Sequence, residues 1–238
     1  MHIVFVGAHP DDETFANGTI AKYIDQGHKA SIVHATMGGK GHWEIPTPEL
    51  ENIRKQEMKE AAKVLGADVR FLGYQDASVP SGDELREALV EVYRELKPDI
   101  VLTFHPLVWR DDHRRVGQAA SDASLKASLP LHETAYPAHR PEPEIFLFGT
   151  PMIQQEPDIF IDVSDYMDQK IASFRKHVSQ WQDWGKPPSE QGNYMDRLIE
   201  GYTHRFREYG RRCGVLYAEA YISKSGLAYA HEMLPVRR

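Results

Sequence analysis

The regular alternation of short β-rich segments with longer amphipathic segments limits the folds open to this 238-residue chain more than any other feature. The β-rich segments comprise residues 3–6, 31–35, 69–72, 100–104, 144–148, 159–163 and 214–222. Apolar residues recur at helical spacing in residues 13–25, 48–65, 82–96, 112–126, 165–181 and 195–211. Such alternation is typical of βαβ units. The sequence therefore predicts an α/β protein with a Rossmann-like, doubly wound, mainly parallel sheet flanked by helices.

We expect a single domain over residues 1–238, because this length suits one core and no linker interrupts the pattern. Two stretches rich in Gly, Pro and polar residues, 37–48 and 128–143, are predicted to be loops. Long loops in a compact fold are more often lids or binding loops than spacers. Both are therefore predicted to be active-site loops.

Charge, hydropathy and cysteine content exclude several functional classes. The net charge is -7 and the mean hydropathy is -0.52, with no long apolar run. These values argue against nucleic acid and membranes as partners, so we expect a cytoplasmic protein that acts on a small molecule. Cys213 is the only cysteine, which excludes an intrachain disulfide and a zinc–thiolate site. Any metal must be held by histidines and carboxylates.

The turn after the first predicted strand reads AHPDDE over residues 8–13. A Rossmann protein carries glycines at this position, where they bind a dinucleotide pyrophosphate. Here those glycines are missing, and carboxylates that would repel a phosphate take their place. The N-terminus of the following helix would keep the carboxylates ionised, which suits a cation. His9 and Asp12 are spaced so that a tight turn can bring both onto one ion.

A third candidate ligand follows the fourth predicted strand. His113 lies in the first turn of a predicted helix, in phase with Val116 and Ala120 on the stripe that faces the sheet. The first and fourth strands are neighbours in the usual doubly wound order, so His9, Asp12 and His113 are expected to meet. Two imidazoles and one carboxylate indicate a catalytic zinc site. The same donors also accept Fe²⁺, Mn²⁺, Co²⁺ or Ni²⁺.

Three further acidic residues lie beside these ligands. Asp11 is free to act as general base toward a water on the metal, and then as proton donor to the leaving group. Glu13 and Asp112 are expected to orient the histidines from behind. Under the alternative interpretation, the aspartates only cap a helix and the histidines are ordinary polar residues with satisfied hydrogen bonds.

The AHPDDE turn followed by FANGT, with a later Asp-His pair that opens a helix, resembles the LmbE-like or PIG-L family of metal-dependent N-acetylglucosaminyl deacetylases. The resemblance continues through IRKQEMKEAAKVLGA, DIFIDVSDYMDQKIASFRKHVSQ and REYGRRCGVLYAEAY. It is strongest for the branch that acts on small soluble N-acetyl sugars and glycosides, including bacillithiol-pathway deacetylases. The resemblance allows a homo-oligomer, a trimer or hexamer, as well as a monomer.

By this resemblance, the protein is a zinc-dependent hydrolase that removes the N-acetyl group from an N-acetylglucosamine-type sugar or glycoside. Its zinc ligands would be His9, Asp12 and His113, and its catalytic base Asp11. Metal-held water would attack the acetyl carbonyl, and amine and acetate would leave.

The resemblance also assigns roles to Arg54 and His177. Arg54 matches an arginine in the helix after the second strand, and it lies on an apolar stripe, so it needs a partner there. That partner is either the substrate or a carboxylate in a salt bridge to the sheet. His177 matches an active-site histidine that could polarise the acetyl carbonyl or shuttle a proton. The alternative places His177 on a helix surface.

Two positions depart from the family pattern. Many members read HPDH where this chain reads RDDH, so Arg110 replaces a histidine that often assists the oxyanion. An arginine stabilises negative charge but cannot donate its proton at working pH. Asn17 stands where a glycine is commoner. The first departure leaves the metal ligands unchanged, but it leaves the substrate and the reaction open.

Aromatic residues on the predicted loops could pack against the apolar face of a sugar. The candidates are Trp43, Trp109 and Tyr74. Anchoring of the loops is the alternative role, which we prefer for Tyr74.

Other functions remain open on the same residues. A related branch comprises metal-dependent hydratases of unsaturated carboxylic acids, whose carboxylates Arg54 and Arg110 could bind. Two histidines and one carboxylate also form the facial triad of Fe(II) oxygenases. A non-catalytic protein could keep the metal for structure alone, but it would have no use for Asp11 beside Asp12, where like charges repel.

Overall fold

A computed structural model of the protein describes residues 1–148, 155–181 and 188–225, with the backbone alone for 188–195. Within these residues, seven strands form one sheet in the order β3-β2-β1-β4-β5-β7-β6. The strands are β1 (His2–Gly7), β2 (Lys29–Thr36), β3 (Asp68–Tyr74), β4 (Ile100–Phe104), β5 (Glu144–Phe148), β6 (Ile159–Asp162) and β7 (Ala218–Ser223).

The first five strands of the sheet are parallel, and β7 runs antiparallel to both β5 and β6. Parallel neighbours need crossover connections, which the helices supply. Strands β1 and β4 pair directly, as the doubly wound order requires. The predicted fold class is confirmed.

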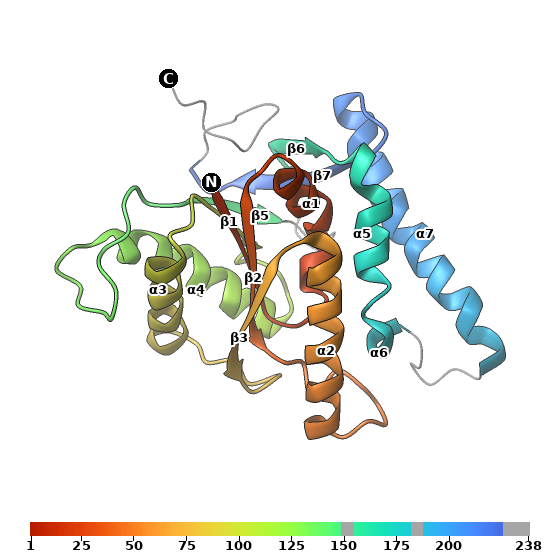
Figure 1. Ribbon diagram of the computed structural model, residues 1–238, viewed down its shortest axis with the longest axis horizontal. Coiled ribbons are helices and arrows are strands. Elements are labelled where there is room, and N and C mark those ends of the chain that lie inside the picture. The colour runs from red at the N-terminus through yellow and green to blue at the C-terminus, as the bar shows by residue number, and fades with distance from the viewer. Residues whose placement is uncertain (149–154, 182–187, 226–238) are drawn as a thin grey trace.

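Helices cover both faces of the sheet (Figure 1). They are η1 (Asp12–Phe15), α1 (Asn17–Asp25), α2 (Thr47–Leu65), α3 (Asp83–Leu96), α4 (Asp111–Ser128), η2 (Ser164–Tyr166), α5 (Met167–Phe174), α6 (Val178–Trp181) and α7 (Pro188–Cys213). Helices α3 and α4 pack together on one face, whereas α1, α2 and α5 pack together on the other. Helix α7 lies along β7.

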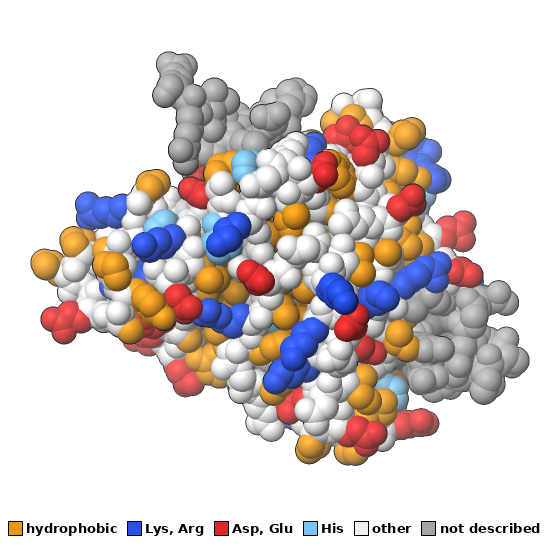
Figure 2. Space-filling view, in the orientation of Figure 1, with side chains coloured by type: hydrophobic (Ala, Val, Ile, Leu, Met, Phe, Trp, Pro, Cys, Tyr) orange, Lys and Arg blue, Asp and Glu red, His pale blue; other side chains and the backbone are white. Residues whose placement is uncertain are grey.

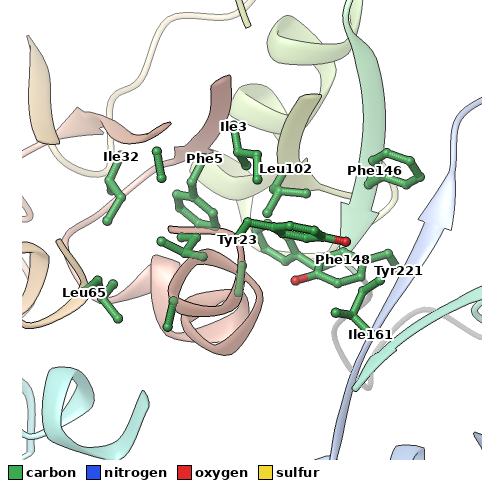
Figure 3. Close-up of a cluster of buried hydrophobic side chains, with 14 of the residues drawn as sticks. Ile3, Phe5, Tyr23, Ile32, Leu65, Leu102, Phe146, Phe148, Ile161 and Tyr221 are labelled. Atoms are coloured by element: carbon green, nitrogen blue, oxygen red, sulfur yellow. The ribbon is translucent and has the colours of Figure 1, made fainter. Parts of the chain in front are cut away.

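The core is split between these two faces because successive side chains of a strand point to opposite sides. Ile3 and Phe5 of β1 pack with α1 and α2, and Val4 and Val6 pack with α3 and α4. Figure 3 shows the first cluster, in which Phe5 stacks on Phe148 with ring centroids 5.4 Å apart. Burial on both faces explains why the central strands are continuous apolar runs.

The surface over α2 and α5 mixes the two signs of charge, since Figure 2 shows Lys and Arg side chains beside Asp and Glu side chains there. None of the described helices is both long and apolar enough to cross a bilayer.

Two predicted helices are interrupted. The segment 165–181 comprises η2, α5 and α6, with a break at residues 175–177, and the segment 13–25 divides at Ala16 into η1 and α1. The first break directs His177 into the interior, where it contacts Glu13 from the far end of the chain. Helical spacing alone does not reveal such a long-range contact. The predicted strand 214–222 begins only at Ala218.

Candidate active site

A pocket of about 500 Å³ opens at the carboxyl edge of the parallel strands. Residues that follow β1, β2, β3 and β4 line it, and α2, α4, α6 and α7 complete its walls. The carboxyl ends of the strands are where a doubly wound fold places its ligands.

A cluster of two histidines and one aspartate lies in this pocket. We call His9, Asp12 and His113 the pocket cluster. Nδ1 of His9 lies 3.2 Å from Nε2 of His113, which lies 3.2 Å from Oδ1 of Asp12. Nδ1 of His9 is 3.8 Å from Oδ2 of Asp12. The structure thus brings together the three residues that the sequence singled out as ligands.

The pocket cluster has the donors and the access that a metal ion requires. One atom from each residue lies within 4.8 Å of the others, and all three side chains line the pocket. Oδ2 of Asp12 accepts hydrogen bonds from the backbone N–H groups of Ala8 and His9, both at 2.8 Å, and Oδ1 faces His113. Burial would raise the pKa of Asp12, but the imidazole of His113 lowers it well below its usual range. Asp12 is therefore ionised.

Two carboxylates hold the other nitrogen of His9. Its Nε2–H donates to Oδ1 of Asp76 at 3.0 Å and to Oδ2 of Asp112 at 3.3 Å. Burial would lower the pKa of His9, but these hydrogen bonds raise it to about 10. Carboxylates behind a histidine fix the ring with Nδ1 toward the pocket. Asp112 therefore lies where the sequence placed it, whereas Asp76 was missed.

Asp76 could have been found from its position. It follows β3 by two residues, at the same sheet edge as His9, so the rule that turns after parallel strands meet at one edge applies to it as well. Oδ2 of Asp76 also accepts the backbone N–H of Lys40 at 2.8 Å. Asp76 thus connects loop 37–48 to the pocket cluster.

Asp11 has an unusual backbone, with φ 115° and ψ -18°, which is strained for any residue except glycine. Its N–H donates to Oε2 of Glu13 at 3.0 Å, and its carbonyl accepts the hydroxyl of Thr14 at 2.6 Å. Burial raises the pKa of the Asp11 carboxyl, although the guanidinium of Arg54 opposes this shift. The carboxyl lines the pocket beside Asp12. Strain held by several contacts is common at functional residues.

Arg54 is enclosed by backbone and by Asp11. Its guanidinium donates to the carbonyls of Gly38, at 3.0 Å, and of Pro10, and to Oδ1 of Asp11 at 3.2 Å. A Cβ atom at Gly38 or Gly41 would lie only 2.4 Å from guanidinium atoms, so a side chain at either position would displace the guanidinium of Arg54. Arg54 also lines the pocket, with a side chain only 4% exposed. Its carboxylate partner in the structure is Asp11.

A second cluster lies behind the pocket. We call His34, Glu13 and His177 the buried cluster, because their side chains are 0% exposed. Nε2 of His177 lies 2.6 Å from Oε1 of Glu13, and Nε2 of His34 lies 3.3 Å from Oε2. Burial would raise the pKa of Glu13 and lower that of His177, but their mutual attraction reverses both shifts. The pair is therefore ionised.

This geometry differs from two details of the sequence analysis. The histidines that Glu13 contacts are His34 and His177, not those of the pocket cluster, because the turn directs Asp12 and Glu13 to opposite sides. His177 lies on no helix surface and outside the described lining of the pocket. It reaches Asp11 through Glu13.

Of the aromatic and cationic residues predicted at the site, some line the pocket and others do not. Trp109 and Arg110 line the pocket, and the Arg110 guanidinium lies 5.4 Å from the centre of the Trp109 ring. Trp43 is 77% exposed, and neither it nor Tyr74 belongs to the described pocket lining. Four lining residues from the C-terminal part of the chain were not foreseen, namely Gln180, Trp181, Tyr202 and Arg205.

The two predicted active-site loops occupy different places. Loop 37–48 supplies Lys40 and Gly41 to the pocket. Residues 128–143 pack against α3, where Arg94 donates to the carbonyls of Leu129 and His132. None of them belongs to the described pocket lining.

Fold and pocket together define a doubly wound α/β protein with histidine and aspartate side chains that could hold a metal ion at the carboxyl edge of its sheet. Residues 4–124 match the model of the PIG-L family, described as GlcNAc-PI de-N-acetylase. The chain therefore belongs to the PIG-L family, which confirms the resemblance seen in its motifs.

Two relatives of this chain have names that state different activities. A probable N-acetyl-alpha-D-glucosaminyl L-malate deacetylase 2 of Bacillus anthracis is 30% identical over 193 residues, covering 76% of this chain and 81% of that relative. A 4-oxalmesaconate hydratase of Pseudomonas putida is 26% identical over 201 residues, covering 75% and 74%.

Solved structures agree on the fold. The N,N'-diacetylchitobiose deacetylase of Pyrococcus horikoshii superposes with a TM-score of 0.83 at 27% identity, covering 99% of this chain and 87% of that one. The match extends over the C-terminal region, beyond the segment that the family model covers.

Proposed function

We propose that the protein is a metal-dependent deacetylase that hydrolyses the acetamide of an N-acetylglucosamine-type sugar or glycoside. The observation that carries this proposal is the convergence of the pocket cluster and the Asp11 carboxyl on one pocket. The names of two relatives, an N-acetylglucosaminyl malate deacetylase and a diacetylchitobiose deacetylase, support the same reaction.

His9, Asp12 and His113 would hold the metal, for which we propose Zn²⁺. Two imidazole nitrogens and a carboxylate oxygen are the ligand set of catalytic zinc sites. The same set accepts Fe²⁺, Mn²⁺, Co²⁺ or Ni²⁺. A cation bound there would acidify a water molecule and polarise the acetyl carbonyl.

Asp11 would move the protons of the reaction. Its carboxylate takes a proton from the attacking water and then returns it to the nitrogen of the leaving amine. The raised pKa suits both tasks, because it brings the two protonation states closer in energy at neutral pH. Arg54 holds the carboxylate in place through the 3.2 Å contact to Oδ1.

Arg110 and His177 would assist in different ways. Arg110 lines the pocket and can stabilise the negative charge that develops on the carbonyl oxygen. His177 is buried against Glu13, whose other oxygen accepts the backbone N–H of Asp11. We therefore propose that His177 positions Asp11 and does not touch the substrate. Trp109 offers its face to the sugar ring.

Release of a primary amine is the direct test, measured with fluorescamine. The substrates are N-acetylglucosamine, diacetylchitobiose and N-acetylglucosaminyl malate. The protein is assayed after loading with zinc, and again after a chelator has removed the metal. We expect amine from the loaded protein alone. Asp11→Asn should lower kcat by about 10²- to 10⁴-fold while metal stays bound. Asp83→Asn, which changes an exposed aspartate on α3, is the matched control.

The deacetylase proposal fails if the loaded protein releases no amine from any of these substrates. It also fails if Asp11→Asn retains full kcat, because no other carboxylate of the described lining lies free beside the pocket cluster.

Assembly as a trimer or hexamer and a cytoplasmic location stay predictions.

Hydration of an unsaturated carboxylic acid is the second candidate. Arg110 in place of the usual histidine and the 26% identical 4-oxalmesaconate hydratase favour it. Addition of water across the conjugated double bond would remove its ultraviolet absorbance. Loss of 4-oxalmesaconate absorbance, without amine release from the sugars, would replace the first proposal with this one.

A further inference from the structure

We propose that Arg205 on α7 selects substrates that carry a carboxylate on the group attached to the sugar. This inference rests on the proposed deacetylase function, whose pocket it extends. Arg205 lines the pocket but lies outside residues 4–124, so the family match predicts nothing about it.

The first argument is the balance of charge in the pocket. The described lining holds three carboxylates and four Lys or Arg side chains. Asp11 pairs with Arg54 at 3.2 Å, whereas Asp12 and Asp76 lie 3.2 Å from His113 and 3.0 Å from His9.

Three cations of the lining have no carboxylate partner among the described side chains. Lys40, Arg110 and Arg205 are absent from the ion pairs formed among the described side chains. The pocket of a chain with a net charge of -7 therefore carries a local surplus of positive charge. Such a surplus attracts an anionic ligand and repels a cationic one.

The second argument is the position of Arg205 relative to Asp11. Its Cζ lies 5.8 Å from the centre of the Tyr202 ring. The Tyr202 hydroxyl lies 3.0 Å from Oγ1 of Thr14, which donates to the carbonyl of Asp11 at 2.6 Å. Tyr202 therefore links Arg205 to the turn that holds Asp11, because its ring lies against the guanidinium and its hydroxyl contacts Thr14. A sugar with its acetamide at Asp11 can lie along this ring, with its other end toward Arg205.

The third argument is the chemistry of the side chain. A guanidinium presents paired N–H donors that match the two oxygens of a carboxylate. The ring beneath Arg205 restricts the side chain, so less entropy is lost when a carboxylate binds. Arg110 directly precedes α4, whose first turn carries His113, whereas Arg205 comes from α7. We therefore assign recognition of the group attached to the sugar to Arg205.

The test compares N-acetylglucosaminyl malate with its dimethyl ester, which has the same skeleton without the charges. Amine release gives kcat/KM for both compounds with the zinc-loaded wild type, Arg205→Gln and Arg205→Lys. We expect the wild type to prefer the acid, and Arg205→Gln to reduce the ratio of acid to ester about tenfold or more. Arg205→Lys should restore part of the ratio. Arg207→Gln, two residues along α7 and in contact with Tyr217, should leave it unchanged.

An unchanged ratio in Arg205→Gln overturns the proposal, as does an equal loss in Arg207→Gln. Binding of the same two compounds to Asp11→Asn, measured by calorimetry, separates this proposal from the proposed function. If the acid binds more tightly than the ester only when Arg205 is present, but no amine is ever released, deacetylation fails and the role of Arg205 stands. If the acid binds no more tightly than the ester, or neither binds, the role of Arg205 is wrong.

Discussion

The pocket cluster and the buried cluster contain the same kinds of side chain, two histidines and one carboxylate each, but their surroundings differ. Their acids, Asp12 and Glu13, are neighbours in the sequence. Asp12 turns one oxygen toward a pocket, while both oxygens of Glu13 are enclosed by imidazoles and the backbone N–H of Asp11. The difference teaches that composition alone does not distinguish a cluster that could hold a metal ion from one that stabilises the fold. Access to the pocket distinguishes them.

The two clusters meet at Asp11. Its carboxyl lies in the pocket beside Asp12, and its backbone is held by Glu13. We infer a division of labour, in which the pocket cluster binds the metal and the buried cluster maintains the strained turn between them. Variants that affect one cluster and spare the other test this division.

The largest effect is expected for His113→Ala. Two remaining ligands bind zinc too weakly to keep it, so the protein should lose its metal, and kcat/KM should fall by about 10³-fold or more. Metal content after gel filtration and amine release measure both losses. His132→Ala removes a histidine that pairs with Glu87 away from the pocket, and it is the control. Stoichiometric zinc in His113→Ala would contradict the assigned ligands.

Glu13→Ala should act on stability instead of metal binding. It leaves the imidazoles of His34 and His177 buried without their carboxylate, which costs about 3–5 kcal/mol of unfolding free energy. Urea unfolding measures this loss. Glu13→Gln keeps the shape of the side chain, so it should fold with a smaller loss, bind zinc fully and show a lower kcat because the Asp11 turn is less firmly held. Loss of zinc from Glu13→Gln at unchanged stability would show that the clusters are not separate.

The stability that the buried cluster provides should depend on pH. The carboxylate of Glu13 has a lowered pKa, so its contribution is present above its ordinary value of 4.5 and is lost as the pH falls through the folded value. The imidazole of His177 has a raised pKa, so its contribution is complete below 6.5 and is lost as the pH rises through the folded value. Both contributions are complete between these ordinary values. We therefore expect the difference in unfolding free energy between wild type and Glu13→Gln to be largest near pH 5.5.

This difference should shrink toward pH 9 by about 1.4 kcal/mol for each unit by which the pKa of His177 is raised. Denaturant unfolding of both proteins across this pH range measures the difference. Groups that titrate identically in the two proteins do not contribute to it. A difference that stays constant over this range would show that His177 is neutral beside Glu13.

The smallest effect is a proton count in the pocket cluster. His9 is protonated at pH 8 in the absence of metal, since its pKa is about 10. Zinc at Nδ1 should therefore release about one proton. Asp76→Asn removes one of the carboxylates that raise this pKa, so fewer protons should be released. Calorimetry in buffers of different ionisation enthalpy counts them. Glu13→Gln should match the wild type, and a lower count there would contradict the separation of the clusters.

The sequence by itself determined the fold class and the composition of the pocket cluster. The alternation of strands and helices is a local pattern, and burial on both faces makes the central strands apolar. His9 and Asp12 belong to one turn, and the doubly wound order places β4, with His113 beyond it, beside β1. Short-range geometry and one topological rule are sufficient to predict their meeting.

Only the tertiary structure decided the rest. His177 contacts Glu13 across 164 positions of the chain, and it does so from a break that helical spacing had concealed. Asp76 joins His9 because the turn after β3 folds back to the same sheet edge. Asp12 and Glu13 look alike as neighbouring acids, and the strained turn at Asp11 sends one to the pocket and the other to the interior. Contacts between distant segments depend on how each loop leaves its strand, and periodicity carries no information about that direction.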